Sequence, residues 1–176
     1  MIPDLVKSEV AIAAYDRSGR LIDATGVQIQ GVLDDLYSYD GDDLGVTYLD
    51  GQPTLKLWAP TAQSVKLWRY KDGTSVNPIA IESLIADPDT GVWSITGDAS
   101  WDRQYYLYEV EVFVPYTDQV EHNFVTDPYS VNLAQNSRRS QIVDLYGDDR
   151  LKPAGWDSLV KPDLAAPEDI AIYEVH

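Results

Sequence analysis

Apolar and polar residues alternate along the centre of the chain with the period of two that half-buried β-strands require. The longest run spans residues 105–114, and its apolar face holds every second residue: Tyr106, Tyr108, Val110, Val112 and Val114. Glu109 and Glu111 fall on the opposite face, which is therefore predicted to face solvent. The full set of predicted strands is 54–58, 65–70, 77–85, 92–96, 105–114 and 119–125.

Short strands separated by turns rich in Asp, Gly and Pro are typical of an antiparallel, immunoglobulin-like β-sandwich. The alternation and turn spacing predict that the core side chains are Leu55, Leu57, Val65, Leu67, Trp93, Tyr108, Val110 and Val112. We therefore expect a mainly β protein, with the sandwich over residues 41–130.

The N-terminal part of the chain predicts different elements. Two apolar stretches, 10–15 and 21–22, flank an Asp/Gly turn and predict a β-hairpin. Apolar residues within 27–37 recur at helical spacing and predict a short helix, which ends before the breaker-rich run 39–43. Residues 1–40 are thus interpreted as the end of a preceding β-rich segment followed by a short helix.

The C-terminal part becomes irregular and rich in Asn, Asp, Pro and Gly. Residues 131–169 are predicted to form a linker, but an anchored one, because a flexible linker would be rich in Gly and Ser. The apolar side chains expected to pack on a neighbouring domain are Tyr129, Leu133, Ile142, Val143, Leu145, Tyr146, Trp156 and Leu159. Residues 170–176 then show a strand pattern with no later element to pair with, which is interpreted as the first strand of a truncated domain.

Composition narrows the classes of partner. The chain has 29 acidic and 13 basic residues and a net charge of −16, which repels nucleic acid and anionic membranes and suits a neutral polysaccharide. There is no cysteine, so thiol catalysis and disulfides are excluded. No apolar run approaches the roughly 20 residues of a membrane span, and the first residues lack a signal-peptide pattern. Localisation stays open, and a secreted or bacterial cell-surface protein is compatible with the sequence.

The ionisable residues do not predict a catalytic or metal site. The adjacent pairs Asp34–Asp35, Asp42–Asp43 and Asp148–Asp149 point in divergent directions on a strand or helix, so they are interpreted as solvated loop charge. Calcium coordination by residues 40–43 is the alternative, although this loop lacks the further spaced ligands of an EF-hand. The two histidines, His122 and His176, are too few for a histidine-based zinc site and are interpreted as structural.

Several separated segments together resemble one enzyme family. The stretches 27–37, with its VLDDLY motif, and 55–65, with its LWAPTA motif, closely resemble the region before the catalytic domain of pullulanases. Residues 125–130, 140–145, 151–157 and 172–176 are similar to the same family's approach to its (β/α)8 barrel. The LWAPTA motif alone also suits isoamylases, branching enzymes and glycogen-debranching enzymes, whereas VLDDLY and KPAGWD favour pullulanase.

This resemblance, which covers about residues 27–176, implies a fragment of a glycosidase in glycoside hydrolase family 13, the α-amylase superfamily. Its sandwich would be of the isoamylase N-terminal type, also called carbohydrate-binding module family 48. The family hydrolyses α-1,6 branch bonds in pullulan, starch or glycogen with retention, using an Asp nucleophile and a Glu acid about 5–5.5 Å apart on barrel strands. Such a barrel typically needs about 250 residues, so the chain alone is expected to lack catalytic residues and activity.

In the parent enzyme the segment would position and stabilise the barrel, with weak α-glucan binding. Residues 170–176 would be the first barrel strand, and Tyr173 or His176 would support the active site. We expect no cofactor in the segment itself, whereas calcium stays open for the parent enzyme. The alternative is a free-standing immunoglobulin-like carbohydrate-binding or adhesion module, which should end after its last strand near residue 125.

Sugar recognition would rest on aromatic faces, for which the candidates are Trp68, Tyr70, Trp101 and Phe124. Trp68 and Tyr70 share a strand face opposite Val65 and Leu67 and are predicted to be an exposed pair. Phe124 falls in the region of one tryptophan of the glycogen-binding members, whose other loop tryptophans have no placed match here. Trp58 and Trp93 are interpreted as core residues.

Overall fold

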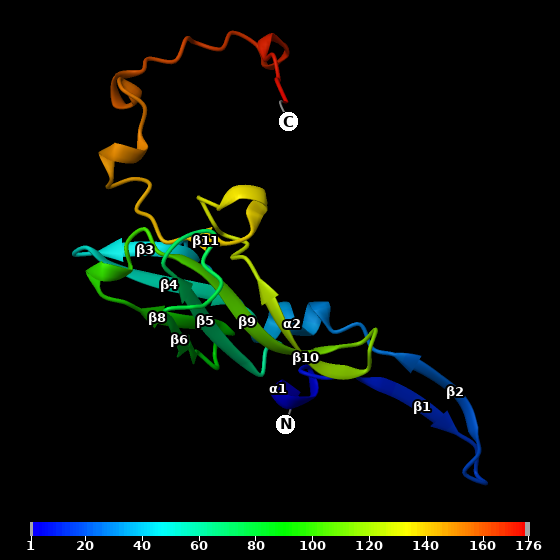
Figure 1. Cartoon of the computed structure of the whole chain (residues 1–176). Coiled ribbons are helices and arrows are strands. Elements are labelled where there is room, and N and C mark those ends of the chain that lie inside the picture. The colour runs from blue at the N-terminus through cyan, green and yellow to red at the C-terminus, as the bar shows by residue number, and fades with distance from the viewer. Residues whose placement is uncertain (1, 175–176) are drawn as a thin grey trace. The chain divides into compact units, whose positions relative to one another are not determined.

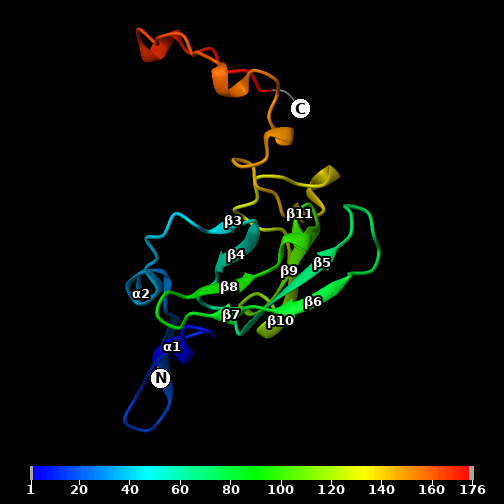
Figure 2. The same cartoon turned by 90° about the vertical axis from the view of Figure 1, so that its left-hand side faces the viewer.

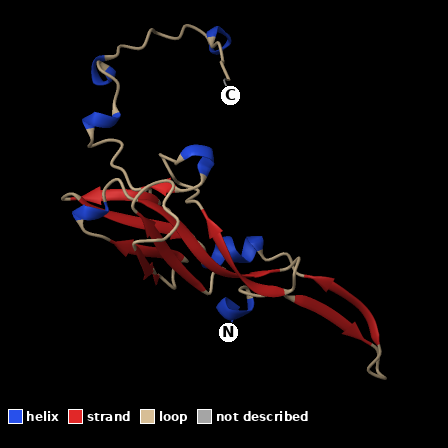
Figure 3. Cartoon of the chain, in the orientation of Figure 1, coloured by secondary structure: helices blue, strands red, loops and turns tan. Residues whose placement is uncertain are grey.

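The computed structural model describes residues 2–174, with the side chain of Ile2 left out. Residues up to Asp144 form one compact unit, and residues from Leu145 onward form a second. Figure 3 shows that the strands belong to the first unit and that the second consists of loops and short helical turns.

The centre of the chain is an antiparallel β-sandwich, as predicted (Figures 1 and 2). One sheet has the order β10 (Gln119–Val125), β9 (Tyr105–Val114), β5 (Ser64–Tyr70) and β6 (Ala80–Ser83), with β11 (Ser140–Gln141) also paired to β9. The other sheet has the order β3 (Gly45–Leu49), β4 (Gln52–Trp58), β8 (Val92–Thr96) and β7 (Ile85–Ala86). The apolar–polar pattern did not predict strand β3, which pairs residue by residue with β4.

The core lies between the two sheets and is formed by alternate residues of their strands. Of the predicted core side chains, Leu55, Leu57, Val65, Leu67, Trp93 and Tyr108 are buried, whereas Val110 and Val112 are half-buried. The core also contains Ala62, Leu84, Trp101, Tyr106 and Ile142. Burying each large apolar side chain contributes about 1.5–3 kcal/mol, so these residues dominate the stability of the unit.

The predicted strand 77–85 is wrong as a single element. Its residues divide between β6 in one sheet and β7 in the other, and Leu84 lies at the crossing point. Leu84 is 6% exposed and belongs to the core, and its backbone N–H donates to the Val65 carbonyl. A strand can change sheets at the corner of a sandwich, and here only Leu84 at that corner is buried, whereas Ile79, Ile81 and Ile85 are exposed.

The N-terminal hairpin and helix are present. Strands β1 (Ala11–Tyr15) and β2 (Leu21–Gly26) form a separate two-stranded sheet, visible in Figure 1, and every one of their residues is exposed. The Asp16 carboxylate accepts hydrogen bonds from the backbone N–H groups of Ser18 and Arg20 and shapes the turn. The helices are α1 (Ile2–Leu5) and α2 (Gln30–Leu36).

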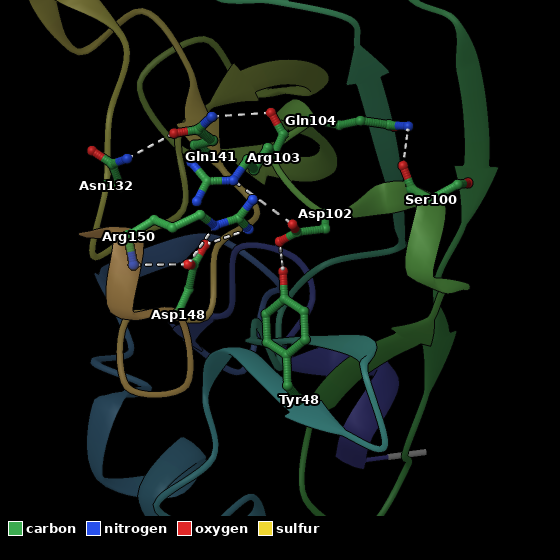
Figure 4. A network of polar contacts seen from close by, with 9 residues as sticks. All are labelled: Tyr48, Ser100, Asp102, Arg103, Gln104, Asn132, Gln141, Asp148 and Arg150. Atoms are coloured by element: carbon green, nitrogen blue, oxygen red, sulfur yellow. Dashed lines mark hydrogen bonds and ion pairs between the residues drawn. The ribbon is translucent and has the colours of Figure 1, made fainter. Parts of the chain in front are cut away.

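The predicted linker 131–169 needs correction at its beginning. Ile142 is fully buried in the sandwich core and Val143 is 2% exposed, so this part packs on the sandwich and not on another domain. Hydrogen bonds brace this part of the chain (Figure 4): within the segment the Asn132 side chain donates to Gln141, and the Gln141 side chain donates to the carbonyl of Arg103, just before β9. The short 3-10 helices are Ala99–Trp101, Gln135–Ser137, Asp149–Leu151, Trp156–Ser158 and Pro167–Asp169.

The strand expected at 170–176 is not formed over residues 170–174, and residues 175 and 176 lie outside the described part. A strand is defined by pairing, and these residues have no paired neighbour within 2–174. Among the helices between residues 2 and 174, none is long and apolar enough to cross a membrane.

Candidate functional site

The outer face of the sheet that contains β5, β9 and β10 gathers the most exposed aromatic pair among the predicted site residues. The registers of the strands place Lys66 opposite Glu109, and Glu109 opposite Phe124, so side chains from three strands share this face. The Trp68 and Phe124 rings meet edge to face, with centroids 5.0 Å apart. Phe124 is 51% exposed, and Trp68 is half-buried.

Glu109 lies at the centre of this surface and is 7% exposed. Its carboxylate accepts a hydrogen bond from the Trp68 indole Nε1 at 2.7 Å and contacts His122 Nδ1 at 2.9 Å. Lys66 Nζ lies 3.5 Å from the same carboxylate. Burial raises the pKa of Glu109, but the Trp68, His122 and Lys66 contacts outweigh it, so the pKa lies below its usual range.

These contacts orient the aromatic pair. The Trp68 indole is fixed by Glu109, and the next acidic residue on the strand, Glu111, accepts a 2.6 Å hydrogen bond from the Ser64 hydroxyl. His122 lies between the two carboxylates, and its side chain is 51% exposed. We define the outer-sheet surface as Trp68, Phe124, Glu109, Lys66 and His122.

Two of the four predicted aromatic site residues lie elsewhere, and the expectation that Tyr70 is exposed is wrong. Tyr70 is 6% exposed, because the Arg139 guanidinium covers its ring at 3.5 Å. Trp101 is 7% exposed and belongs to the core, with the Arg69 guanidinium 3.9 Å from its ring. Strand alternation could not predict that arginines cover these two rings, since each arginine is distant in sequence from the ring that it covers.

The other two tryptophans differ from each other. Trp93 is 9% exposed and belongs to the core, as predicted, and its indole donates to the Ala59 carbonyl at 3.0 Å. Trp58 was also expected in the core but is half-buried, on the face of β4 opposite Leu55 and Leu57. Its indole donates to the carbonyls of Tyr37 and Thr90, both at 3.0 Å.

The acidic pairs do not form a site, and some of them are not simply solvated. The Asp43 carboxylate accepts hydrogen bonds from Lys56 and Tyr39, which lower its pKa and occupy both of its oxygens. In the second unit, Asp148 pairs with Arg150 and Asp149 pairs with Lys152. Within residues 2–174, no group of three or more His, Asp or Glu side chains is arranged to hold a metal ion.

The outer-sheet surface is a candidate binding face, and its carboxylate is not suited to act as a catalytic acid. A glycosidase acid must hold a proton near neutral pH, whereas the contacts around Glu109 favour its ionised form. An edge-to-face aromatic pair flanked by carboxylate, ammonium and imidazole groups offers both apolar contact and hydrogen-bonding groups. The fold and this surface therefore define a β-sandwich module with a candidate binding face on one sheet.

Comparison with known families specifies the module. The model described as carbohydrate-binding module 48 (isoamylase N-terminal domain) matches residues 43–130, and the model described as the pullulanase N2 domain matches residues 1–35. The chain therefore belongs to the carbohydrate-binding module 48 family and has the N-terminal type of domain found in pullulanases.

The relatives agree over the whole sequence. The chain is 45% identical to chloroplastic pullulanase 1 of Arabidopsis thaliana and 38% identical to the pullulanase of Klebsiella pneumoniae, in each case over 99% of its own length. A crystal structure of the Klebsiella pneumoniae pullulanase complexed with maltotriose matches 90% of the chain with a TM-score of 0.84. The chain spans only 15% to 18% of the length of these relatives.

Proposed function

We propose that this chain is the non-catalytic N-terminal part of an enzyme that hydrolyses α-1,6-glucosidic branch bonds in pullulan, starch or glycogen. The carrying observation is the similarity to pullulanases over 99% of the chain. The barrel strands that would hold a nucleophile and an acid are not part of the module, and Glu109 is held ionised, so the segment itself has no catalytic role.

Its first task is to position and stabilise the catalytic barrel. The second unit supports this proposal, because it has little internal packing and many exposed apolar side chains. These side chains are Tyr146, Trp156, Leu159, Val160, Leu164, Ile172 and Tyr173. So many exposed large apolar side chains in one short segment are typical of an interaction site. A free-standing adhesion module would gain nothing from exposing these groups, so the docking role is the better explanation.

Its second task is weak contact with α-glucan through the outer-sheet surface. Trp68 and Phe124 supply ring faces for the C–H side of glucose units, while Glu109, Lys66 and His122 lie beside them for the hydroxyl groups. A neutral polymer also avoids repulsion by a chain of net charge −16.

Nuclear magnetic resonance tests the glucan contact. Maltotriose added to the ¹⁵N-labelled chain should shift the indole N–H signal of Trp68, and Phe124→Ala should weaken the titrated affinity severalfold. The control is Val120→Ala, which shortens an exposed side chain on the same strand without touching Trp68. An unmoved Trp68 signal, or equal effects of the two variants, would exclude binding at this surface.

Hydrogen exchange tests the docking role. The amides around Trp156 and Leu159 should exchange more slowly in an enzyme that includes the barrel than in this chain, because docking would exclude water from the segment. The amides of β5 should exchange equally in both proteins. Equal exchange of the Trp156 region as well would contradict docking.

A further inference from the structure

A second candidate site lies on the other sheet of the sandwich. A cavity of about 380 Å³, within the range of about 300–1,000 Å³ that is usual for small-ligand pockets, opens beside the outer face of β4. Its lining includes Tyr37, Tyr39, Trp58, Tyr129, Asp34 and Ser38. We name this the α2 pocket, because Asp34 comes from helix α2 and Tyr37 ends it.

The aromatic walls of the α2 pocket are held in place by their own contacts. The Trp58 indole donates to the carbonyls of Tyr37 and Thr90, which fixes the ring plane. The Tyr39 hydroxyl donates to Asp43 and accepts from Lys56 Nζ at 3.2 Å. Rings that are already fixed lose little further freedom when a ligand binds.

Close backbone packing holds the remaining wall. Gly45 begins β3 with φ of 86°, and a Cβ added there would lie 2.9 Å from Tyr129 Cβ. The Tyr129 N–H also donates to the Asp127 carboxylate at 2.8 Å. The Tyr129 backbone is therefore tied both to β3 and to the buried Asp127.

Two polar groups at the pocket remain uncommitted. Asp34 and Ser38 are exposed, and neither side chain has a hydrogen-bond partner among residues 2–174. A carboxylate and a hydroxyl beside fixed aromatic rings match a hydroxyl-rich, uncharged ring, whose C–H face meets the aromatic groups and whose hydroxyls meet the polar ones. Asp34 and the net charge of −16 disfavour an anion.

A cation is the rival occupant, because aromatic walls attract ammonium groups. The Lys56 ammonium already lies 5.8 Å from the centroid of the Tyr39 ring. The Tyr39 ring therefore already has a cation beside it, and the charge of that cation is paired with Asp43. A hydroxyl-rich ring, in contrast, would use both the aromatic walls and the Asp34 and Ser38 groups, and the test below separates the two occupants.

We propose that the α2 pocket is a second carbohydrate subsite, which holds one glucose unit of an α-glucan between Trp58 and Tyr39, with Asp34 accepting hydrogen bonds from its hydroxyls. This inference rests on the proposed glucan-binding function and extends it to a site on the opposite sheet from Trp68 and Phe124. One module would then contact a glucan on both of its outer faces.

The two indole N–H signals distinguish the two sites in one titration. Maltotriose should shift the Trp58 signal as well as the Trp68 signal, with the two signals assigned from Trp58→Phe and Trp68→Phe. Asp34→Asn should raise the maltotriose dissociation constant measured from the Trp58 signal about 10-fold, because it replaces a charged hydrogen-bond acceptor by a neutral one. The dissociation constant measured from the Trp68 signal should not change. The matched control is Asp35→Asn, which removes the same charge one residue along α2 from a side chain that does not line the pocket.

Each other outcome is informative. A shift of the Trp68 signal without a shift of the Trp58 signal would overturn the α2-pocket subsite and leave glucan binding at the outer-sheet surface standing. No shift of either signal would contradict both binding proposals. If Asp34→Asn and Asp35→Asn raised the dissociation constant at Trp58 equally, the change would come from the loss of one negative charge near the pocket. That result would overturn the subsite. A Trp58 response to tetramethylammonium in place of maltotriose would show a cation site instead.

Discussion

On the outer face of the sheet, the Glu109 side chain is 9% exposed although its strand position faces away from the core. The Trp68 indole and the Lys66 and His122 side chains surround it from the two neighbouring strands. Alternation along β9 assigned Glu109 to a wet face, because the pattern of one strand carries no information about the rings that lean over it. The residue that organises the candidate site was therefore missed.

We expect Glu109→Gln to lower the free energy of unfolding at pH 7 by about 1 kcal/mol, since hydrogen bonds to a neutral amide are about half as strong as those to a carboxylate. The folded pKa of Glu109 is lowered, so its ionised form stabilises the fold above the unfolded pKa of about 4.3. This stabilisation is lost as the pH falls through the folded pKa. Urea unfolding between about pH 7 and about pH 2 measures the difference between the two proteins.

The control for this prediction is Glu111→Gln. Its side chain is 31% exposed and accepts one hydrogen bond, from Ser64, so the loss at pH 7 should be smaller. A wild-type advantage over Glu109→Gln that stays constant down to pH 2 would mean that the ionised carboxylate is not its source.

Among the elements, the short segment that contains β11 decides where the sandwich ends. Ser140 and Gln141 pair with β9, and Ile142 fills the core next to them. The local sequence is irregular and predicts a linker, because a two-residue strand is too short to show an alternation of apolar and polar residues. Only its contact with β9, more than 30 residues earlier, reveals it as part of the sandwich.

Ile142→Ala should lower the free energy of unfolding by about 2–5 kcal/mol, because it leaves a cavity among fully buried neighbours. The comparison is Tyr146→Ala, four residues later and 87% exposed, which should change stability by no more than about 0.5 kcal/mol. Denaturant unfolding of both variants measures this. Similar small losses would place Ile142 outside the cooperative unit.

At the scale of the whole molecule, the chain consists of a well-packed unit up to Asp144 and a second unit with sparse internal packing. Most of the second unit's large apolar side chains are exposed, as expected of a segment that packs on a further domain. In our proposal, that further domain is a catalytic barrel.

The purified chain should release no reducing sugar from pullulan or maltosaccharides, because it lacks the barrel strands that would carry a nucleophile and an acid. The pullulanase of Klebsiella pneumoniae, assayed at equal molar concentration, is the positive control. Activity that copurifies with the chain and is abolished by substituting one of its own carboxylates would refute a non-catalytic role.

The sequence by itself determined the strands β4, β5, β8, β9 and β10, the N-terminal hairpin and most of the core, because the period of two is a local property that needs no knowledge of pairing. Its separated motifs also determined the family. Only the tertiary structure decided that Leu84 marks a change of sheet, that Arg139 covers Tyr70, and that Trp68 lies against Glu109 and Phe124. These features depend on contacts between segments that are distant in sequence, which local patterns do not specify.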